Sequence, residues 1–157
     1  MIDTTTMQND TDITEFVTFT IAGQLFGLPI ERVQDVFKPV NMTRVPLAGA
    51  EIAGVLNLRG RIVTAVDMRN RLEVKKRQSR DALMAIGIEA KGESFGLLVD
   101  AVGEVLKLSN TEREPNPVNL DRKLAVLSAG VYRLDGQLLV VLDVDRVLDL
   151  RGEAVAA

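Results

Sequence analysis

The stretch FGLPIERVQDVFK, residues Phe26–Lys38, returns 69 residues later as FGLLVDAVGEVLK, residues Phe95–Lys107, with six of thirteen positions identical. A second pair of stretches, Ala53–Leu72 and Ala129–Leu148, matches at seven of twenty positions with an offset of 76. Such internal matches indicate a duplicated structural unit. The difference between the two offsets predicts a seven-residue insertion in the second half, within the polar, proline-containing segment 110–123.

Both halves predict the same order of elements: strand, turn, Phe-Gly strand, short amphipathic segment, loop, hairpin and short helix. Residues 16–21 alternate in polarity, with Val17, Phe19 and Ile21 on one face, and the turn Ala22–Gln24 predicts a hairpin. Glycines at the bends predict two more hairpins, at 56–63 and 132–139. In the second of these, Asp135-Gly136 is a pair typical of primed turns.

The amphipathic segment 31–37 follows helical spacing. Val33, Val36 and Phe37 stand at positions i, i+3 and i+4, with Glu31, Arg32 and Asp35 outward, so this segment predicts a short helix.

Many short strands, glycine turns and a duplication predict a mainly β fold: two small β-barrel lobes packed together, with short helices. We expect one cooperative unit that is monomeric on its own, because each lobe covers the apolar face of the other. The expected boundaries are an N-terminal tail at 1–13, a domain at 14–150 (lobe one about 14–72, connector 73–81, lobe two about 82–150) and a C-terminal tail at 151–157.

The amino-acid composition excludes several classes of functional site and disfavours some partners. The 157 residues include neither cysteine nor histidine, which excludes disulfides, thiolate nucleophiles, Cys/His zinc sites and imidazole bases. A formal charge of −3 disfavours nucleic acid as a partner. The longest apolar run, Leu138–Leu142, is too short to span a membrane, and the N-terminus lacks the pattern of a signal peptide, so we expect a cytoplasmic protein.

Two patterns suggest chemistry and are better explained otherwise. Gly92–Gly96 matches G-x-S-x-G, which makes a serine hydrolase using Ser94 a remote alternative; this stretch is expected in a hairpin turn, and no histidine is present as base. Asp143, Asp145 and Asp149 suggest a calcium loop but lack its ligand spacing, and the first two would favour the start of a helix at 144–150. We therefore expect no catalytic residue, metal or cofactor.

The hairpin Gly54–Gly60 differs between the two halves. Strand alternation places Asn57 and Arg59 on one side of the hairpin, where the second copy carries Arg133 and Asp135. This pattern fits either a solvated strand edge or a surface that one half uses for binding.

The run IAGVLNLRGRIVTAVDMR at Ile52–Arg69, together with EFVTFTIAGQLFGLPIERVQDV and FGLLVDAVGEVLKLS, closely resembles the CheW family of chemotaxis adaptor proteins. The resemblance covers about residues 14 to 150. It implies two five-stranded barrels and a non-enzymatic role: linking transmembrane chemoreceptors to the histidine kinase CheA in clustered arrays at the membrane. Members contact the receptor's cytoplasmic hairpin tip in a groove between the lobes. They also contact the kinase's regulatory domain, which has a related fold.

The resemblance also implies receptor-facing residues, and it implies that the acid at position 35 pairs with Arg59. It places no kinase-facing residues. An alternative within the same class is a coupling module of another chemosensory-type pathway, for surface motility or development. The receptor-facing positions are Val33, Asp35, Val36, Gly54, Asn57 and Arg59, to which the internal match with Val33 adds Val102.

Overall fold

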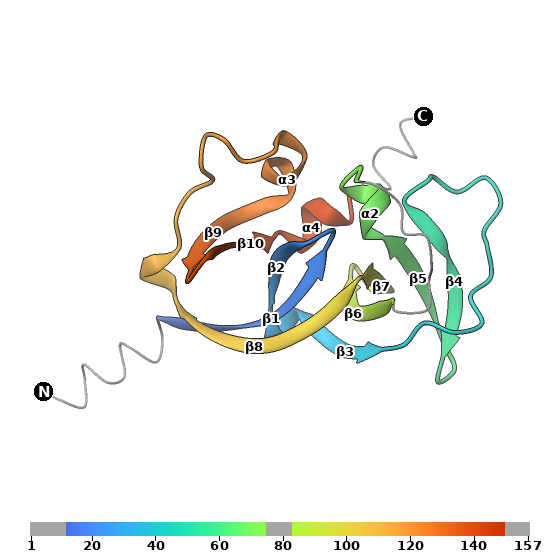
Figure 1. Cartoon of the computed structure of the whole chain (residues 1–157). Coiled ribbons are helices and arrows are strands. Elements are labelled where there is room, and N and C mark those ends of the chain that lie inside the picture. Colours follow the sequence, from blue (N-terminus) through green and yellow to red (C-terminus); the bar gives the residue numbers. More distant parts are fainter. Residues whose placement is uncertain (1–11, 75–82, 150–157) are drawn as a thin grey trace, which may run out of the picture.

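The computed structural model of the chain describes residues 12–74 and 83–149, which form ten strands and a few short helices (Figure 1). The strands are β1 (Ile13–Ile21), β2 (Gln24–Pro29), β3 (Val33–Phe37), β4 (Ile52–Leu58), β5 (Arg61–Asp67), β6 (Met84–Ala90), β7 (Glu93–Val99), β8 (Ala101–Ser109), β9 (Ser128–Leu134) and β10 (Gln137–Leu142). The α-helices are α2 (Met68–Arg71), α3 (Arg122–Leu127) and α4 (Val144–Val147), and 3₁₀ turns occur at η1 (Ile30–Arg32) and η2 (Asn110–Glu112).

The strands form two five-stranded sheets. Sheet A has the order β8-β1-β2-β10-β9, and sheet B has the order β3-β6-β7-β5-β4. Exchanging β1–β5 for β6–β10 converts one order into the other, so the two sheets are related by a pseudo-two-fold exchange of sequence halves. The predictions of a mainly β fold and of two five-stranded lobes are confirmed.

The sheets do not coincide with the two halves of the sequence. The first half contributes β1 and β2 to sheet A and β3–β5 to sheet B, and the second half does the reverse. The expected lobes at 14–72 and 82–150 therefore each supply strands to both sheets. Most of the expected connector, most of the N-terminal tail and all of the C-terminal tail lie outside the described residues.

The largest apolar cluster lies between the two sheets. It joins inward side chains of both sheets, including Phe19, Phe26, Ile86, Leu97 and Val140, with residues of α2 and α4. Each sheet also encloses a smaller cluster on its other face, one around Phe16 and Tyr132 and one around Ala85 and Leu98. Because the central strands are buried on both faces, they read as nearly continuous apolar runs.

In each sheet, a loop crosses the outer strand of the last hairpin and pairs with it through two backbone hydrogen bonds. Thr43 exchanges two backbone hydrogen bonds of 2.8 Å with Val55 of β4. Glu114 makes the equivalent pair with Val131 of β9. The crossing requires a glycine, because a Cβ on Gly54 would lie 2.5 Å from the carbonyl oxygen of Thr43.

The predicted helix at 31–37 is wrong. Only Ile30–Arg32 forms a 3₁₀ turn, and Val33–Phe37 is strand β3, paired with β6. Val33 and Phe37 are four residues apart, a spacing that puts them on one face of a helix and equally on one face of a strand. Cross-strand pairing with β6 decides between the two.

The hairpin predictions hold with one correction. Hairpins form at 22–23, 59–60 and 135–136, as predicted. In the first two, both turn residues have positive φ, as a type I′ turn requires. In the third, only Gly136 has a positive φ, so the primed turn expected at Asp135-Gly136 is wrong.

The predicted last helix is present but shorter than expected, Val144–Val147, and α3 at Arg122–Leu127 overlaps the predicted insertion segment 110–123 only at its first two residues. Between β8 and β9 the second half contains α3, whereas the corresponding described segment between β3 and β4 holds no helix. Asp143 accepts a hydrogen bond from the backbone nitrogen of Arg146 and caps α4. The calcium-loop pattern is therefore explained by a helix cap. Across the described residues, no helix has the length and apolarity needed to cross a membrane.

A buried ion pair joins the two sheets. Asp100 lies where the chain leaves β7 of sheet B for β8 of sheet A, and Arg69 of α2 donates two hydrogen bonds to it, at 3.0 and 2.6 Å. The backbone nitrogen of Ala22, in the β1–β2 turn, donates a third at 2.8 Å. The two charged side chains are only 18% and 14% exposed, and the hydrogen bond to Asp100 raises the pKa of Arg69 above its ordinary value.

Replacing Asp100 with alanine should lower the free energy of unfolding by about 3 kcal/mol, because the largely buried Arg69 guanidinium loses the carboxylate that accepts two of its hydrogen bonds. The matched control is Asp145→Ala. In the repeat, Asp145 occupies the position of Arg69, and it makes an exposed 3.8 Å pair with Arg32, which should contribute less than about 1 kcal/mol. Urea unfolding of both variants measures the difference, and equal losses would contradict the role of Asp100.

Replacing Gly54 with alanine should cost about 1–3 kcal/mol, because the new methyl group would overlap the crossing backbone at Thr43. Gly96→Ala serves as control, since a Cβ there would have its nearest neighbours at ordinary contact distance, 3.4 Å. Thermal unfolding compares the two. If Gly54→Ala is as stable as Gly96→Ala, the crossing loop adapts and Gly54 is not required for packing.

A candidate partner-binding surface

The β4–β5 hairpin ends in a tight turn that presents an arginine. Arg59 and Gly60 both have positive φ, 54° and 83°, and the Asn57 side-chain oxygen accepts a 2.8 Å hydrogen bond from the Gly60 nitrogen. A left-handed backbone is unfavourable for arginine, so this conformation stores strain at an exposed position. Because β4 ends at Leu58, the expectation that strand alternation aligns Asn57 with Arg59 is wrong.

Asp35 pairs with a different arginine from the one the resemblance implied. Its Oδ2 lies 3.6 Å from Nη2 of Arg61, the first residue of β5. Arg59 is exposed and makes no ion pair or side-chain hydrogen bond with the residues that the structure describes. The ion pair joins β3 to β5, which are not neighbours in sheet B, so the sheet is curved enough to bring its far strands together.

Two of the predicted valines support the core and one is exposed. Val33 and Val102 are half-buried and pack against the cluster between the sheets. Val36 is 40% exposed on β3, and its repeat counterpart, Val105 on β8, is 47% exposed. The internal repeat that linked Val33 to Val102 also links Val36 to Val105, and exposure distinguishes the second pair as the one accessible to a partner.

Gly54 is buried, and its role is the loop crossing described above. The second hairpin is arranged differently from the first. Arg133, which replaces Asn57, donates a 2.9 Å hydrogen bond to Glu114 in the crossing loop. Arg133 of the second hairpin is therefore paired within the protein, whereas Arg59 of the first hairpin has no ion pair with the described residues.

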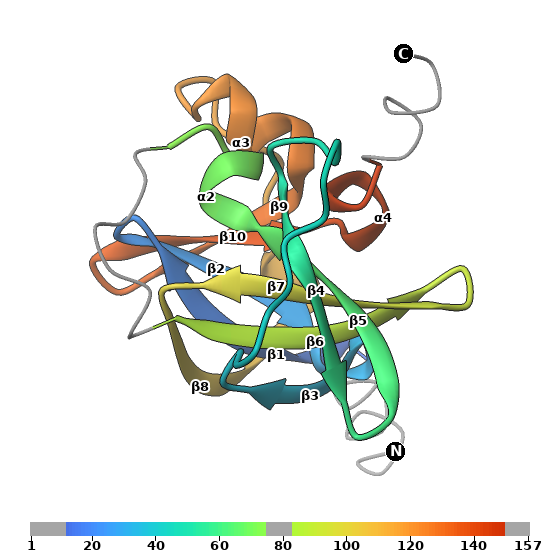
Figure 2. The same ribbon diagram turned by 90° about the vertical axis from the view of Figure 1, so that its right-hand side faces the viewer.

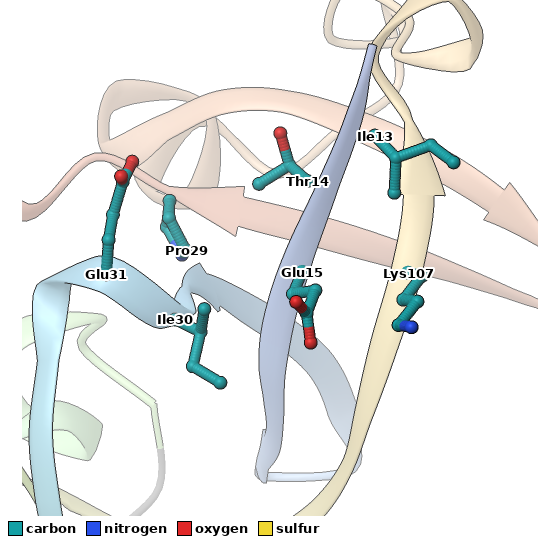
Figure 3. A pocket seen from close by; sticks show the side chains of 7 residues that line it. All are labelled: Ile13, Thr14, Glu15, Pro29, Ile30, Glu31 and Lys107. Atoms are coloured by element: carbon teal, nitrogen blue, oxygen red, sulfur yellow. The ribbon is translucent and has the colours of Figure 1, made fainter. Parts of the chain in front are cut away.

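A cleft lies where the start of β1 meets η1 and the end of β8 (Figure 3). It measures about 370 Å³, and Ile13 and Ile30 expose apolar surface within it. Figure 3 shows Glu15 and Lys107 side by side on neighbouring strands, consistent with their pairing in the β1–β8 register. Because η1 leads into β3 of sheet B, the cleft lies at the junction of the two sheets.

A second, smaller pocket of about 230 Å³ lies beneath the loop that precedes β4. Arg69, Asp100 and Asp67 line it, and these side chains are already engaged in the inter-sheet pair and the cap of α2. This pocket is therefore explained by structural contacts.

The structure thus brings together Asp35 and the β4–β5 hairpin through Arg61, and it does not bring Val102 to that hairpin. None of the seven predicted site residues lines the 370 Å³ cleft. The sequence did not single out Arg61, Val105 or the residues that line the cleft as site residues. Only Val105 carried a usable signal, because it is the repeat counterpart of Val36.

Ser94, the residue of the hydrolase alternative, is the second residue of strand β7 and pairs with Val63 and Glu89. The β6–β7 hairpin turns at Lys91-Gly92, so only the first residue of the stretch Gly92–Gly96 lies on the turn, and Ser94 is already in the strand. A nucleophile elbow requires a sharp turn from strand into helix, and β7 continues as a strand beyond Ser94.

Comparison with known proteins gives a consistent result. A family model described as CheW-like domain matches residues 15–152. The chemotaxis protein CheW of Rhizobium meliloti is 29% identical over 133 residues, covering 85% of this chain and 86% of that protein. The chemotaxis protein CheA of Salmonella typhimurium is 27% identical over 135 residues, covering 85% of this chain and 19% of that protein.

Among solved structures, the scaffolding protein TtCheW of Thermoanaerobacter tengcongensis superimposes with a TM-score of 0.78 at 30% identity. The match covers 88% of this chain and 90% of that one. The fold, the internal duplication and the family match agree, and the chain belongs to the CheW-like domain family.

Proposed function

We propose that this chain is a non-enzymatic adaptor that couples transmembrane chemoreceptors to the histidine kinase CheA in signalling arrays. The observation that carries the proposal is the β4–β5 hairpin of a CheW-like domain, which presents Arg59 exposed, in a strained conformation and unpaired among the described residues. An exposed cation without an ion pair among the described residues can bind a partner without first breaking an internal contact.

The proposed receptor surface combines this cation with apolar side chains. Val36 and Val105 are exposed on β3 and β8, two strands that run along the lower side of the molecule in Figures 1 and 2. The cleft at the junction of the sheets adds Ile13 and Ile30. A hairpin of two helices offers an apolar stripe of the kind that such a surface accommodates, and arginine is common among the residues that dominate binding energy.

The proposed kinase partner is supported by the match to CheA. The matched segment is a fifth of that protein and is similar to this chain over most of its length. A kinase domain with the same fold could contact this chain through equivalent surfaces. We place the protein in the cytoplasm, recruited to receptor clusters. It is monomeric when alone, because its largest apolar cluster is already covered internally.

The proposal is tested with purified components: this chain, CheA, and a soluble fragment of the receptor's cytoplasmic hairpin tip. Capture of each partner separately, and increased kinase activity when all three are mixed, is the expected result. Failure of this chain to capture either partner at micromolar concentration would contradict the proposed function.

Replacing Arg59 with glycine should separate folding from binding. Glycine tolerates φ of 54°, so the melting temperature should stay the same or rise, whereas loss of the guanidinium should weaken receptor capture by about 30-fold. Asp135→Ala, at the repeat counterpart of Arg59, is the control and should change capture by less than about twofold. Calorimetric titration measures both, and equal losses would argue against a receptor site on the first hairpin.

Replacing Val36 with aspartate should leave the protein folded, because the side chain is 40% exposed, and should weaken receptor capture by more than about tenfold. Val105→Asp should behave alike. Val126→Asp on α3, another exposed valine, is the control and should bind normally. Titrations and melting curves of the three variants provide the measurement. Normal receptor binding by both Val36→Asp and Val105→Asp would exclude this surface.

A further inference from the structure

We infer that Arg61 is a positioning residue of the partner-binding surface: by neutralising Asp35 it keeps the Arg59 guanidinium available for a carboxylate or carbonyl oxygen of the partner. The identity of the partner rests on the proposed function. The ion pair itself is a property of the isolated protein and can be tested without a partner.

The Asp35 carboxylate is held in a fixed position. Asp35 on β3 pairs with Gly87 on β6, and a Cβ on Gly87 would overlap Oδ1 of Asp35. This oxygen is buried and has no hydrogen-bond partner among the residues that the structure describes. A carboxylate in such a position has lost part of its hydration, so a cation on its open side is favoured.

Arg61 is the cation on the open side of the Asp35 carboxylate. Arg61 begins β5 directly after the turn and pairs with Leu58 of β4, so its backbone is set by the hairpin register. Its Nη2 lies 3.6 Å from Oδ2 of Asp35. Figures 1 and 2 both show the tip of the β4–β5 hairpin beside β3, in agreement with this contact.

Two arginines lie close enough in the sequence to compete for the Asp35 carboxylate. Arg59 and Arg61 flank Gly60 at the hairpin tip, and both have long, flexible side chains. Because Arg61 is paired with Asp35, Arg59 binds a partner without first breaking an internal ion pair. Removing Arg61 makes Asp35 an internal competitor for Arg59, so affinity for the partner should fall although Arg61 itself touches no partner atom.

The experiment is a set of calorimetric titrations of the receptor-tip fragment with the full chain. Arg61→Gln should weaken binding by about 3- to 10-fold, and Arg61→Lys, which keeps the charge, should stay within about twofold of the wild type. In an Asp35→Asn background the competitor is absent, so adding Arg61→Gln should cost less than about twofold. Arg133→Gln removes a cation from the second hairpin and should not change receptor binding.

Two results would overturn the inference. If Arg61→Gln weakens binding equally in the wild-type and the Asp35→Asn backgrounds, Arg61 contacts the partner directly and does not act through Asp35. If Arg61→Gln has no effect in either background, Arg59 does not need the protection that Arg61 is inferred to give.

Thermal unfolding of the isolated protein tests the Asp35–Arg61 pairing independently of any partner. The melting temperatures of Asp35→Asn, Arg61→Gln and the double variant should be non-additive, whereas Asp35→Asn and Arg59→Gly should add. Additive Asp35 and Arg61 effects, or coupling between Asp35 and Arg59, would overturn the assigned pairing. If the wild type fails to bind the receptor fragment, the proposed function fails, and this cycle still reports which arginine Asp35 holds.

Discussion

The apolar cluster between the two sheets is the contact on which the rest of the structure depends. Each sheet is apolar on both faces, and its own enclosed cluster, around Tyr132 in one sheet and Ala85 in the other, is small. The face toward the partner sheet carries the larger aromatic and aliphatic side chains. Separating the sheets would expose that face to water, so the two lobes must fold and unfold together.

This constraint also explains where the candidate surface lies. The outer strands are β8 and β9 in sheet A and β3 and β4 in sheet B, and crossing loops pair with β4 and β9 but not with β3 or β8 among the described residues. The hairpin that presents Arg59 is held from one side by the crossing loop at Thr43 and from the other by the Arg61–Asp35 pair. The backbone of a hairpin held in this way has little freedom to lose when a partner arrives.

The sequence was sufficient for most of the strands, the positions of the hairpins and the duplication, because alternation and glycine turns are local signals. It was insufficient for Val33–Phe37, where spacing fits both a helix and a strand and pairing with β6 decides. An internal repeat shows which segments are equivalent, but it does not reveal that equivalent segments are exchanged between sheets. The partner of Asp35 was also hidden, since Arg59 and Arg61 are chemically alike and only the path of the turn selects between them.

The exchange of strands between the sheets has a consequence for the history of the chain. A protein made of one half alone could complete its sheets only by associating with a second copy, so the simplest ancestor is a homodimer with intertwined subunits. Such a dimer must carry two identical hairpins. Fusion of the two copies removes that requirement, and here the first hairpin carries Arg59, which has no ion pair with the described residues, while the second engages Arg133 with Glu114. Fusion thus allows the two equivalent surfaces of a symmetric dimer to become different. A protein that binds two different partners needs two such different surfaces.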